Sequence, residues 1–250
     1  MHSDWSIVGD IGDLLNRLDR EPIDRPSRDW SDAHQTAVAA ATPRRRTASV
    51  GLDPAGVLEI MREQLPSDTI VASDAGNFSV YLHSYWPYGG AHTQLAPISG
   101  AMGYGVPAGV AAALARPDRR VIAVAGDGGF LMSGMEIETA VRYGAAMTIL
   151  VFRNGLYGTI AMHQRREMGR TAGVDIGAVD IAKLAEALGA VGVTVSDEQT
   201  LRVELERAGT FSGVTVLDII TDPDLITPTV RLSEIGGTPA ASHPDHKETS

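Results

Sequence analysis

Residues 121–158 have the sequence VIAVAGDGGFLMSGMEIETAVRYGAAMTILVFRNGLYG, and this stretch decides the fold of the chain. The apolar run 121–125 predicts a short buried strand, and 126–129, Gly-Asp-Gly-Gly, predicts a sharp turn after it. Spaced apolar positions along 133–143 predict a helix, and the apolar run 147–152 predicts a second buried strand. The stretch therefore predicts a strand–turn–helix–strand unit, which builds parallel sheets.

Two polar side chains, Asp127 and Asn154, follow the two predicted strands. In a parallel sheet, ligands bind beyond the carboxyl ends of the strands. The interval of 27 residues between them is long enough for one crossover, which needs a dozen or more. Carboxylate and amide oxygens on adjacent strand ends suit a hard cation such as Mg²⁺, which fills its other positions with water and phosphate oxygens.

The glycines around Asp127 favour a phosphate ligand. Gly126, Gly128 and Gly129 let backbone N–H groups approach a phosphate closely, and the following helix presents its N-terminus to it. A dinucleotide fingerprint is excluded because Leu131 stands where it needs glycine, and the chain contains no P-loop motif. A diphosphate held through a metal ion is the prediction, although Gly-Asp-Gly also occurs in plain turns.

This pattern resembles the diphosphate-binding motif of thiamine diphosphate (ThDP)-dependent enzymes, especially acetolactate synthases and 2-oxoacid decarboxylases. The resemblance extends from about Asp53 to Pro228. It implies that Mg²⁺ is bound by the side chains of Asp127 and Asn154 and by the backbone carbonyl of Leu156. The cofactor-binding residues that it implies are Asn77, Gly100, Ala101, Met102, Gly126, Asp127, Gly128, Gly129, Asn154, Leu156 and Tyr157.

The glycine-rich segment 99–105 resembles the part of the family that keeps the cofactor bent. The resemblance implies that Gly100 offers its carbonyl to the aminopyrimidine ring and that Met102 lies beneath the bend. Bending brings the amino group of that ring close to the thiazolium, a proximity effect. By itself the pattern also suits a tight helix N-terminus with a core methionine. Asn77-Phe78 stands where many acetolactate synthases carry Gln-His.

Composition excludes several classes of function. The net charge of −10 disfavours nucleic-acid binding, which needs concentrated Lys and Arg. No cysteine is present, which excludes disulfides, thiolate catalysis and cysteine-based zinc sites. The first residues contain no signal-peptide core, and no apolar run is long enough to span a membrane. We therefore expect a cytoplasmic protein that binds neither nucleic acid nor membrane.

Four regions are predicted along the chain. Residues 1–18, with a strand at 6–10 and then an amphipathic helix, resemble the end of the family's central domain, so the chain is expected to be a C-terminal piece or a separate subunit. The alternative is an N-terminal extension that packs on the main domain. Residues 19–50 form a linker by composition, 51–230 the ThDP- and Mg-binding domain, and 231–250 a disordered tail.

Alternating strands and helices predict an α/β fold with a doubly wound, mostly parallel sheet and helices on both faces. Asp53 and Pro54 predict a helix start. A cluster of aromatic residues lies in 79–94, a predicted strand-end loop for which packing or a subunit interface is favoured over a substrate pocket. Strands are predicted at 69–72, 121–125, 147–152, 191–195 and 213–219, with another near 94–97. Helices are predicted from Asp53 to Pro66 and at 107–114, 133–143, 157–167, 180–188 and 197–208.

The resemblance also implies what this chain does not supply. In the family a Glu from another domain, across a subunit interface, activates the cofactor. No catalytic residue is therefore expected here, and a homo-oligomer or a separate chain should supply the pyrimidine-binding domain. The predicted activity is decarboxylation and carboligation of 2-oxoacids. The alternatives are a non-catalytic ThDP-binding module, a subunit of a two-chain decarboxylase, and a Rossmann-like nucleotide-binding protein.

Overall fold

The computed structural model describes residues 8–20 and 31–236. The chain divides into two compact units, Met1–Ala41 and Thr42–Ser250, and each is described by itself. The second unit contains every strand of the described chain and is the unit that positions the site. Among the described helices, none is long and apolar enough to cross a bilayer. The cytoplasmic location stays a prediction.

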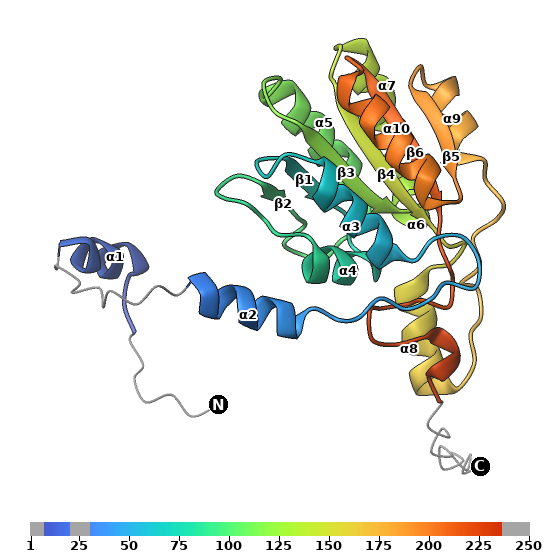
Figure 1. Ribbon diagram of the computed structural model, residues 1–250, viewed down its shortest axis with the longest axis horizontal. Helices are drawn as coiled ribbons and strands as arrows, with labels where there is room; N and C mark the ends of the chain where they lie inside the picture. The colour runs from blue at the N-terminus through green and yellow to red at the C-terminus, as the bar shows by residue number, and fades with distance from the viewer. Residues whose placement is uncertain (1–7, 21–30, 237–250) are drawn as a thin grey trace, which may run out of the picture. The chain divides into compact units, whose positions relative to one another are not determined.

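The second unit is built on one six-stranded sheet in which all strands are parallel, in the order β2-β1-β3-β4-β6-β5. Figure 1 shows the strands side by side, with their carboxyl ends toward α6 and α8. The predicted strand near 94–97 exists, but it is short and lies at the sheet edge. The strands are β1 (Ile70–Ser73), β2 (Gln94–Leu95), β3 (Val121–Gly126), β4 (Met147–Arg153), β5 (Val191–Val195) and β6 (Val214–Ile220).

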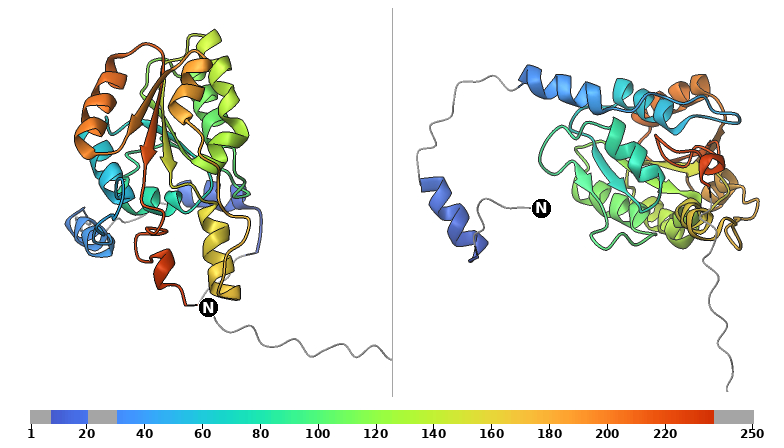
Figure 2. Two further views of the ribbon diagram at one scale, coloured as in Figure 1. Left: turned by 90° about the vertical axis from the view of Figure 1, so that its right-hand side faces the viewer. Right: turned by 90° about the horizontal axis from the view of Figure 1, so that it is seen from below.

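Helices cover both faces of the sheet, as predicted, and Figure 2 shows the three layers edge-on. One face packs on α3, α4 and α10, and the other on α5, α7 and α9. The residues of the four central strands, β1, β3, β4 and β6, are almost completely buried, which is the pattern of a parallel sheet covered on both sides, whereas the edge strands β2 and β5 are only partly buried. The helices of this unit are α3 (Pro54–Gln64), α4 (Phe78–Tyr85), α5 (Gly105–Ala115), α6 (Asp127–Ser133), α7 (Ile137–Arg142), α8 (Gly158–Met168), α9 (Ile181–Ala187) and α10 (Glu198–Thr210), with short 3₁₀ turns η1 (Gly134–Glu136) and η2 (Leu232–Glu234).

The helix start predicted at Asp53 is confirmed. The Asp53 side chain accepts a hydrogen bond from the Ala55 amide, and Pro54 is the first helical residue. Asp180 and Asp197 begin α9 and α10 in the same way, each by accepting a backbone N–H three residues later. These caps satisfy donors that the first helical turn leaves without partners.

The helix predicted over 133–143 is wrong in its start. The helical backbone begins at Asp127, directly after β3, so Gly126 is the only residue of the predicted turn that lies outside it. The helix then changes to 3₁₀ geometry at Gly134, which packs against the ring of Phe130. Phe130 is fully buried and anchors this glycine-rich turn, so tertiary contacts override its low helix propensity.

The expectation for the aromatic segment 79–94 differs in part from the structure. The aromatic segment is not a loop throughout, because Phe78–Tyr85 form α4, and Tyr81, Tyr85 and Trp86 are buried in the core. This burial supports packing as their role. Tyr81 also bonds through its hydroxyl to the carbonyl of Leu225.

The terminal regions differ in part. Residues 6–7 of the predicted strand lie outside the described residues, and 8–10 form no strand before α1 (Ile11–Arg20). Within the predicted linker, the alanine-rich stretch Ser31–Ala41 forms α2, a full helix. The start of the predicted tail is ordered, because the Ser233 amide and hydroxyl both donate to Asp224; residues 237–250 lie outside the described part.

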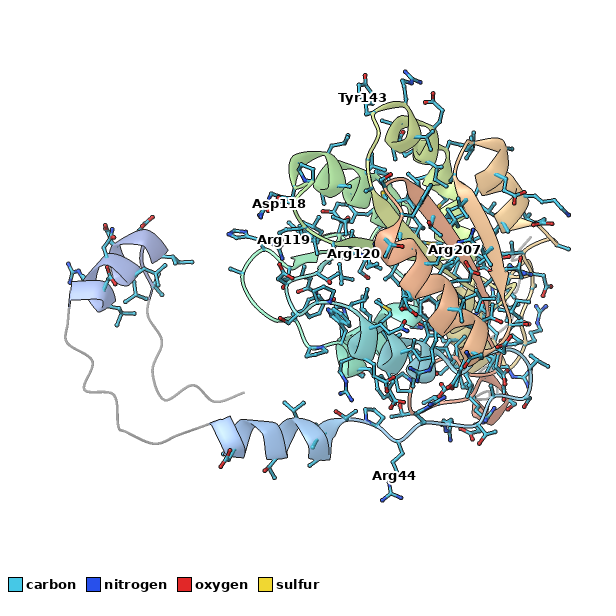
Figure 3. All side chains as sticks on the ribbon, turned by 45° about the horizontal axis from the view of Figure 1, so that its top comes forward. Arg44, Asp118, Arg119, Arg120, Tyr143 and Arg207 are labelled. Carbon is cyan, nitrogen blue, oxygen red and sulfur yellow. The ribbon has the colours of Figure 1, made fainter. Side chains whose placement is uncertain are left out.

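The amino ends of the strands carry basic residues whose bonds are internal. Arg119 and Arg120 lie side by side immediately before β3 (Figure 3). The Arg120 guanidinium donates to the Ala208 carbonyl and the Thr148 hydroxyl, and Arg119 donates to the His92 carbonyl. At the amino end of β3 these arginines therefore hold neighbouring segments together by hydrogen bonds within the protein. The candidate site lies at the opposite, carboxyl end of the strands.

Candidate functional site

The site lies where the sheet reverses its winding. The connection after β1 leads through α4 toward β2, whereas the connection after β3 leads through α6 toward β4 on the other side. Adjacent strands whose connections diverge in this way leave a crevice between their carboxyl ends, which is where ligands bind in such folds. The loops after β1, β3 and β4 border this crevice.

Asp127 joins two of these loops. Its carboxylate oxygens accept hydrogen bonds from the Gly128 amide, at 2.9 Å, and from the Gly155 amide, at 2.6 Å. The side chain is only 3% exposed. Within the described chain, no basic side chain forms a salt bridge with it. Asp127 is therefore a buried carboxylate held only by backbone amides.

The electrostatic setting of Asp127 follows from this burial. Desolvation raises the pKa of its carboxyl above the usual value, while the amides of Gly155, Gly128 and Asn154 oppose that rise. A buried anion with no cationic partner is costly, and a bound divalent cation removes that cost. The carboxylate is thus suited to hold a metal ion.

The loop after β4 supplies the other predicted metal ligands. The Asn154 side-chain oxygen accepts a bond from the Leu156 amide at 3.0 Å, which closes a tight turn. Gly155 has φ +73°, a conformation that glycine adopts easily. The turn is held from outside by Ile176, whose amide donates to the Gly155 carbonyl. These bonds fix a turn whose residues Asn154 and Leu156 line the same cavity as Asp127.

The predicted glycines form a close-fitting cradle. A Cβ atom on Gly128 would lie 2.7 Å from the Tyr157 ring and 3.2 Å from the Met102 methyl group. A Cβ on Gly129 would lie 2.0 Å from an oxygen of the Asp74 carboxylate. A side chain at either position would therefore force these neighbouring side chains to move, as expected where a backbone closes on its surroundings. Met102 and Tyr157 converge over Gly128 from two separate loops.

A cavity of about 240 Å³ collects nearly all of the predicted cofactor-binding residues. Ala101 is the exception, because it lies in the same loop as Gly100 and Met102 but does not line the cavity. Those from the prediction that line it are Asn77, Gly100, Met102, Gly126, Asp127, Gly128, Gly129, Asn154, Leu156 and Tyr157.

Sequence analysis missed part of the cavity wall. Thr159 donates its hydroxyl to the Asn77 side-chain oxygen at 2.9 Å and so fixes Asn77. Its place two residues after Tyr157, at the start of a helix that follows a strand-end turn, was a usable signal. Leu225 and Ile226 also line the cavity, and they are buried residues of a segment that carries no periodic pattern. Nothing in the sequence pointed to them.

The residues present fit a hard cation with a phosphate. Nowhere in the described part of the chain do three or more His, Asp or Glu side chains gather as a metal site. A metal here would instead use one carboxylate, one amide oxygen and one carbonyl oxygen, all hard ligands. The glycine cradle leaves the backbone accessible to a phosphate beside them.

Comparisons with known proteins identify the family of the chain. A family model described as the C-terminal TPP-binding domain of thiamine pyrophosphate enzymes matches residues 74–219. The chain is 31% identical to a catabolic acetolactate synthase of Raoultella terrigena and 28% identical to an acetolactate synthase of Bacillus subtilis (strain 168). Each of these alignments covers 88% of this chain and 40% of the relative, so the chain spans about two fifths of their length.

A solved structure of another thiamine diphosphate-dependent enzyme supports the same family. The thiamine diphosphate-dependent 4-hydroxybenzoylformate decarboxylase of Rhodococcus jostii RHA1 superimposes with a TM-score of 0.68 at 28% identity, over 72% of this chain and 34% of that one. The matched family region runs from the end of β1 to β6 and contains both Asp127 and Asn154. The chain therefore belongs to the thiamine pyrophosphate enzyme family, of which it carries the C-terminal TPP-binding domain.

Proposed function

We propose that this chain holds the diphosphate of ThDP through Mg²⁺ as part of an acetolactate synthase-like enzyme that decarboxylates 2-oxoacids and joins the product to a second carbonyl compound. The observation that carries the proposal is Asp127, a buried carboxylate with no basic partner, beside Asn154 on one glycine-lined cavity. The relatives identify the family, and the carboxylate, amide and carbonyl oxygens of the site favour Mg²⁺ as the metal ion.

Each residue has a defined part in this proposal. The Asp127 and Asn154 side chains and the Leu156 carbonyl would bind Mg²⁺. The Gly128 and Gly129 backbone would approach the diphosphate, and Met102, whose methyl group already lies over Gly128, would support the thiazolium. When bound, the thiazolium accepts the electron pair that decarboxylation of a 2-oxoacid releases. The side chains of this domain bind and orient the cofactor.

A partner domain would supply the Glu that activates the cofactor. Exposed apolar side chains next to the cavity support this part of the proposal. Met102, Tyr104, Met132 and Met135 are 37%, 37%, 57% and 60% exposed, and residues 94–115 contain no charged residue. Exposed apolar patches of this kind mark interaction sites. We propose that a second copy or a separate chain covers this surface and completes the site.

Calorimetric titration of the purified chain with ThDP tests the binding. We expect binding in MgCl₂ and none in EDTA, with neither NAD nor ATP able to displace ThDP. Saturation at one hundred times Kd should stabilise the fold by about 2.7 kcal/mol, measured by thermal unfolding. Binding that is equally strong in EDTA, or that NAD abolishes, contradicts the proposal.

An activity assay tests the need for a partner. The chain alone should consume pyruvate very slowly, because a positioned acid or base contributes about 10² to 10⁴-fold to such steps. Addition of a chain that carries the activating Glu should restore the rate. Full turnover by the lone chain would refute the partner, and failure of every partner would favour a non-catalytic ThDP-binding module.

A further inference from the structure

A second buried carboxylate, Asp74, lies at the carboxyl end of β1 and has no role in the proposed binding of metal or phosphate. It is 2% exposed, and no salt bridge within the described chain involves it. Its two oxygens accept three backbone hydrogen bonds. Those from Ala75, at 2.8 Å, and Tyr104, at 3.1 Å, reach one oxygen, and that from Gly103, at 3.0 Å, reaches the other.

These bonds join β1 to the loop that carries Gly100 and Met102. Two of the three donors, Gly103 and Tyr104, belong to this loop, and Asp74 lies about thirty residues earlier in the sequence. The Asp74 amide itself donates to the Val124 carbonyl of β3, at 2.8 Å, so the anchor is part of the sheet. The loop is thereby fixed to the rigid core at its carboxyl-terminal end.

The same carboxylate lies against the glycine cradle. A Cβ on Gly129 would come within 2.0 Å of the Asp74 oxygen that accepts from Gly103. Asp74 thus packs between the cradle and the Gly103–Tyr104 backbone. The Met102 methyl group, from the same loop, lies close to Gly128, the neighbouring residue of the cradle.

We propose that Asp74 is a positioning residue, which sets the Gly100–Tyr104 loop against the Gly128–Gly129 cradle so that the thiazolium and diphosphate ends of ThDP are bound in register. The inference rests on the proposed function. The positioning role requires a carboxylate at residue 74, because backbone N–H groups donate to both side-chain oxygens of Asp74. Asparagine in its place turns an NH₂ group toward at least one N–H donor and loses a loop bond.

The test compares how tightly one variant, Asp74→Asn, binds two different ligands. Inorganic pyrophosphate with Mg²⁺ occupies only the cradle, whereas ThDP with Mg²⁺ also needs the Gly100–Tyr104 loop. We expect the calorimetric Kd for ThDP to rise about tenfold or more, since hydrogen bonds to charged groups are worth that much. The Kd for pyrophosphate should stay within about twofold of the wild type.

Asp53→Asn is the matched control. Asp53 is also a buried aspartate that accepts a backbone N–H, but its side-chain partners are Ala55 and Arg45, and neither belongs to the Gly100–Tyr104 loop. This variant should change neither Kd. Circular dichroism and thermal unfolding establish that each variant is folded.

A second variant tests the same link from the donor side. The backbone φ of Tyr104 is −82°, which proline can adopt, so Tyr104→Pro removes the N–H that Asp74 accepts and leaves the carboxylate in place. The same split between ThDP and pyrophosphate is expected, and this variant decides the question should Asp74→Asn not fold.

The outcomes separate this inference from the proposed function. Wild-type protein that binds no ThDP in Mg²⁺ overturns the proposed function itself. Wild-type binding with an unchanged Kd in Asp74→Asn overturns only the positioning role. An equal loss for ThDP and pyrophosphate also overturns it, because Asp74 would then support the cradle or the fold as a whole. A loss confined to ThDP supports it.

Discussion

Two buried aspartates at the site end of the sheet behave differently. Asp218, on β6, is fully buried and forms an ion pair with Arg153, whose Nε lies 2.7 Å from its carboxylate. Asp127, after β3, is equally buried but is held by amides alone, and burial raises its pKa. The first carboxylate is already neutralised by the protein. The second has no salt-bridge partner in the described chain and lines the cavity together with Asn154, which Asp218 does not, and this is why we propose it as the metal ligand.

Arg153 interacts with both aspartates, but in different ways. Arg153 is the last residue of β4 and directly precedes Asn154. Its positive charge favours the ionised form of Asp127, but this is the weakest of the influences on the Asp127 pKa. Its hydrogen bond goes to Asp218 instead. The charge of Arg153 thus stabilises the sheet through its ion pair with Asp218, and Asp127 takes no part in that pair.

The substitution Asp127→Asn, which keeps the shape of the side chain and removes its charge, should have the largest effect on ThDP binding. The Mg²⁺-dependent affinity for ThDP should fall more than about 100-fold, because even residues that only support metal ligands contribute 10- to 100-fold. Stability without metal should stay within about 1 kcal/mol, since relief of the buried charge offsets a lost amide bond. Titration calorimetry and thermal unfolding measure the two quantities.

A large loss of metal-free stability would break the comparison, because it would make Asp127 a structural residue like Asp218. Asp180→Asn serves as the control, since Asn is also a good N-cap and Asp180 lies outside the cavity. It should leave both stability and ThDP affinity close to those of the wild type.

Asp218→Asn should show the opposite pattern. Loss of the charged partner leaves Arg153 with a weaker acceptor, which lowers the free energy of unfolding by about 2 kcal/mol. The cost is limited because the Arg153 side chain is 29% exposed and can reach water. ThDP affinity in Mg²⁺ should remain near the wild-type value. If affinity falls as far as in Asp127→Asn, the division of roles between the two aspartates is wrong.

The sequence allowed the sheet and the metal pair to be predicted because both depend on local signals. Apolar runs such as 147–152 identify buried strands, and a polar residue that follows such a run lies at the carboxyl edge of a parallel sheet. Asp127 and Asn154 were found in this way, and they do line one cavity. Their binding of Mg²⁺ stays a prediction.

What could not be predicted depends on contacts between distant segments. The helix that begins at Asp127 has three poor helix formers at its start, and it exists because Gly155 binds the Asp127 carboxylate and Phe130 is buried. The bonds of Asp74 to Gly103 and Tyr104 likewise join positions that share no sequence pattern. No periodicity records such partners.

The smallest expected effect concerns Thr194, on β5, whose hydroxyl donates to the Asp218 carboxylate at 3.3 Å. Thr194→Val removes the hydroxyl and keeps the β-branched shape that strands favour, so the change isolates one long hydrogen bond. We expect unfolding free energy to fall by about 0.5 kcal/mol, with ThDP affinity unchanged. The same substitution in the Asp218→Asn background should cost less, because the acceptor is no longer charged. An equal cost in both backgrounds would mean that the Thr194 hydroxyl stabilises the fold independently of Asp218. Arg153 would then be the only side chain of the two that stabilises the Asp218 carboxylate.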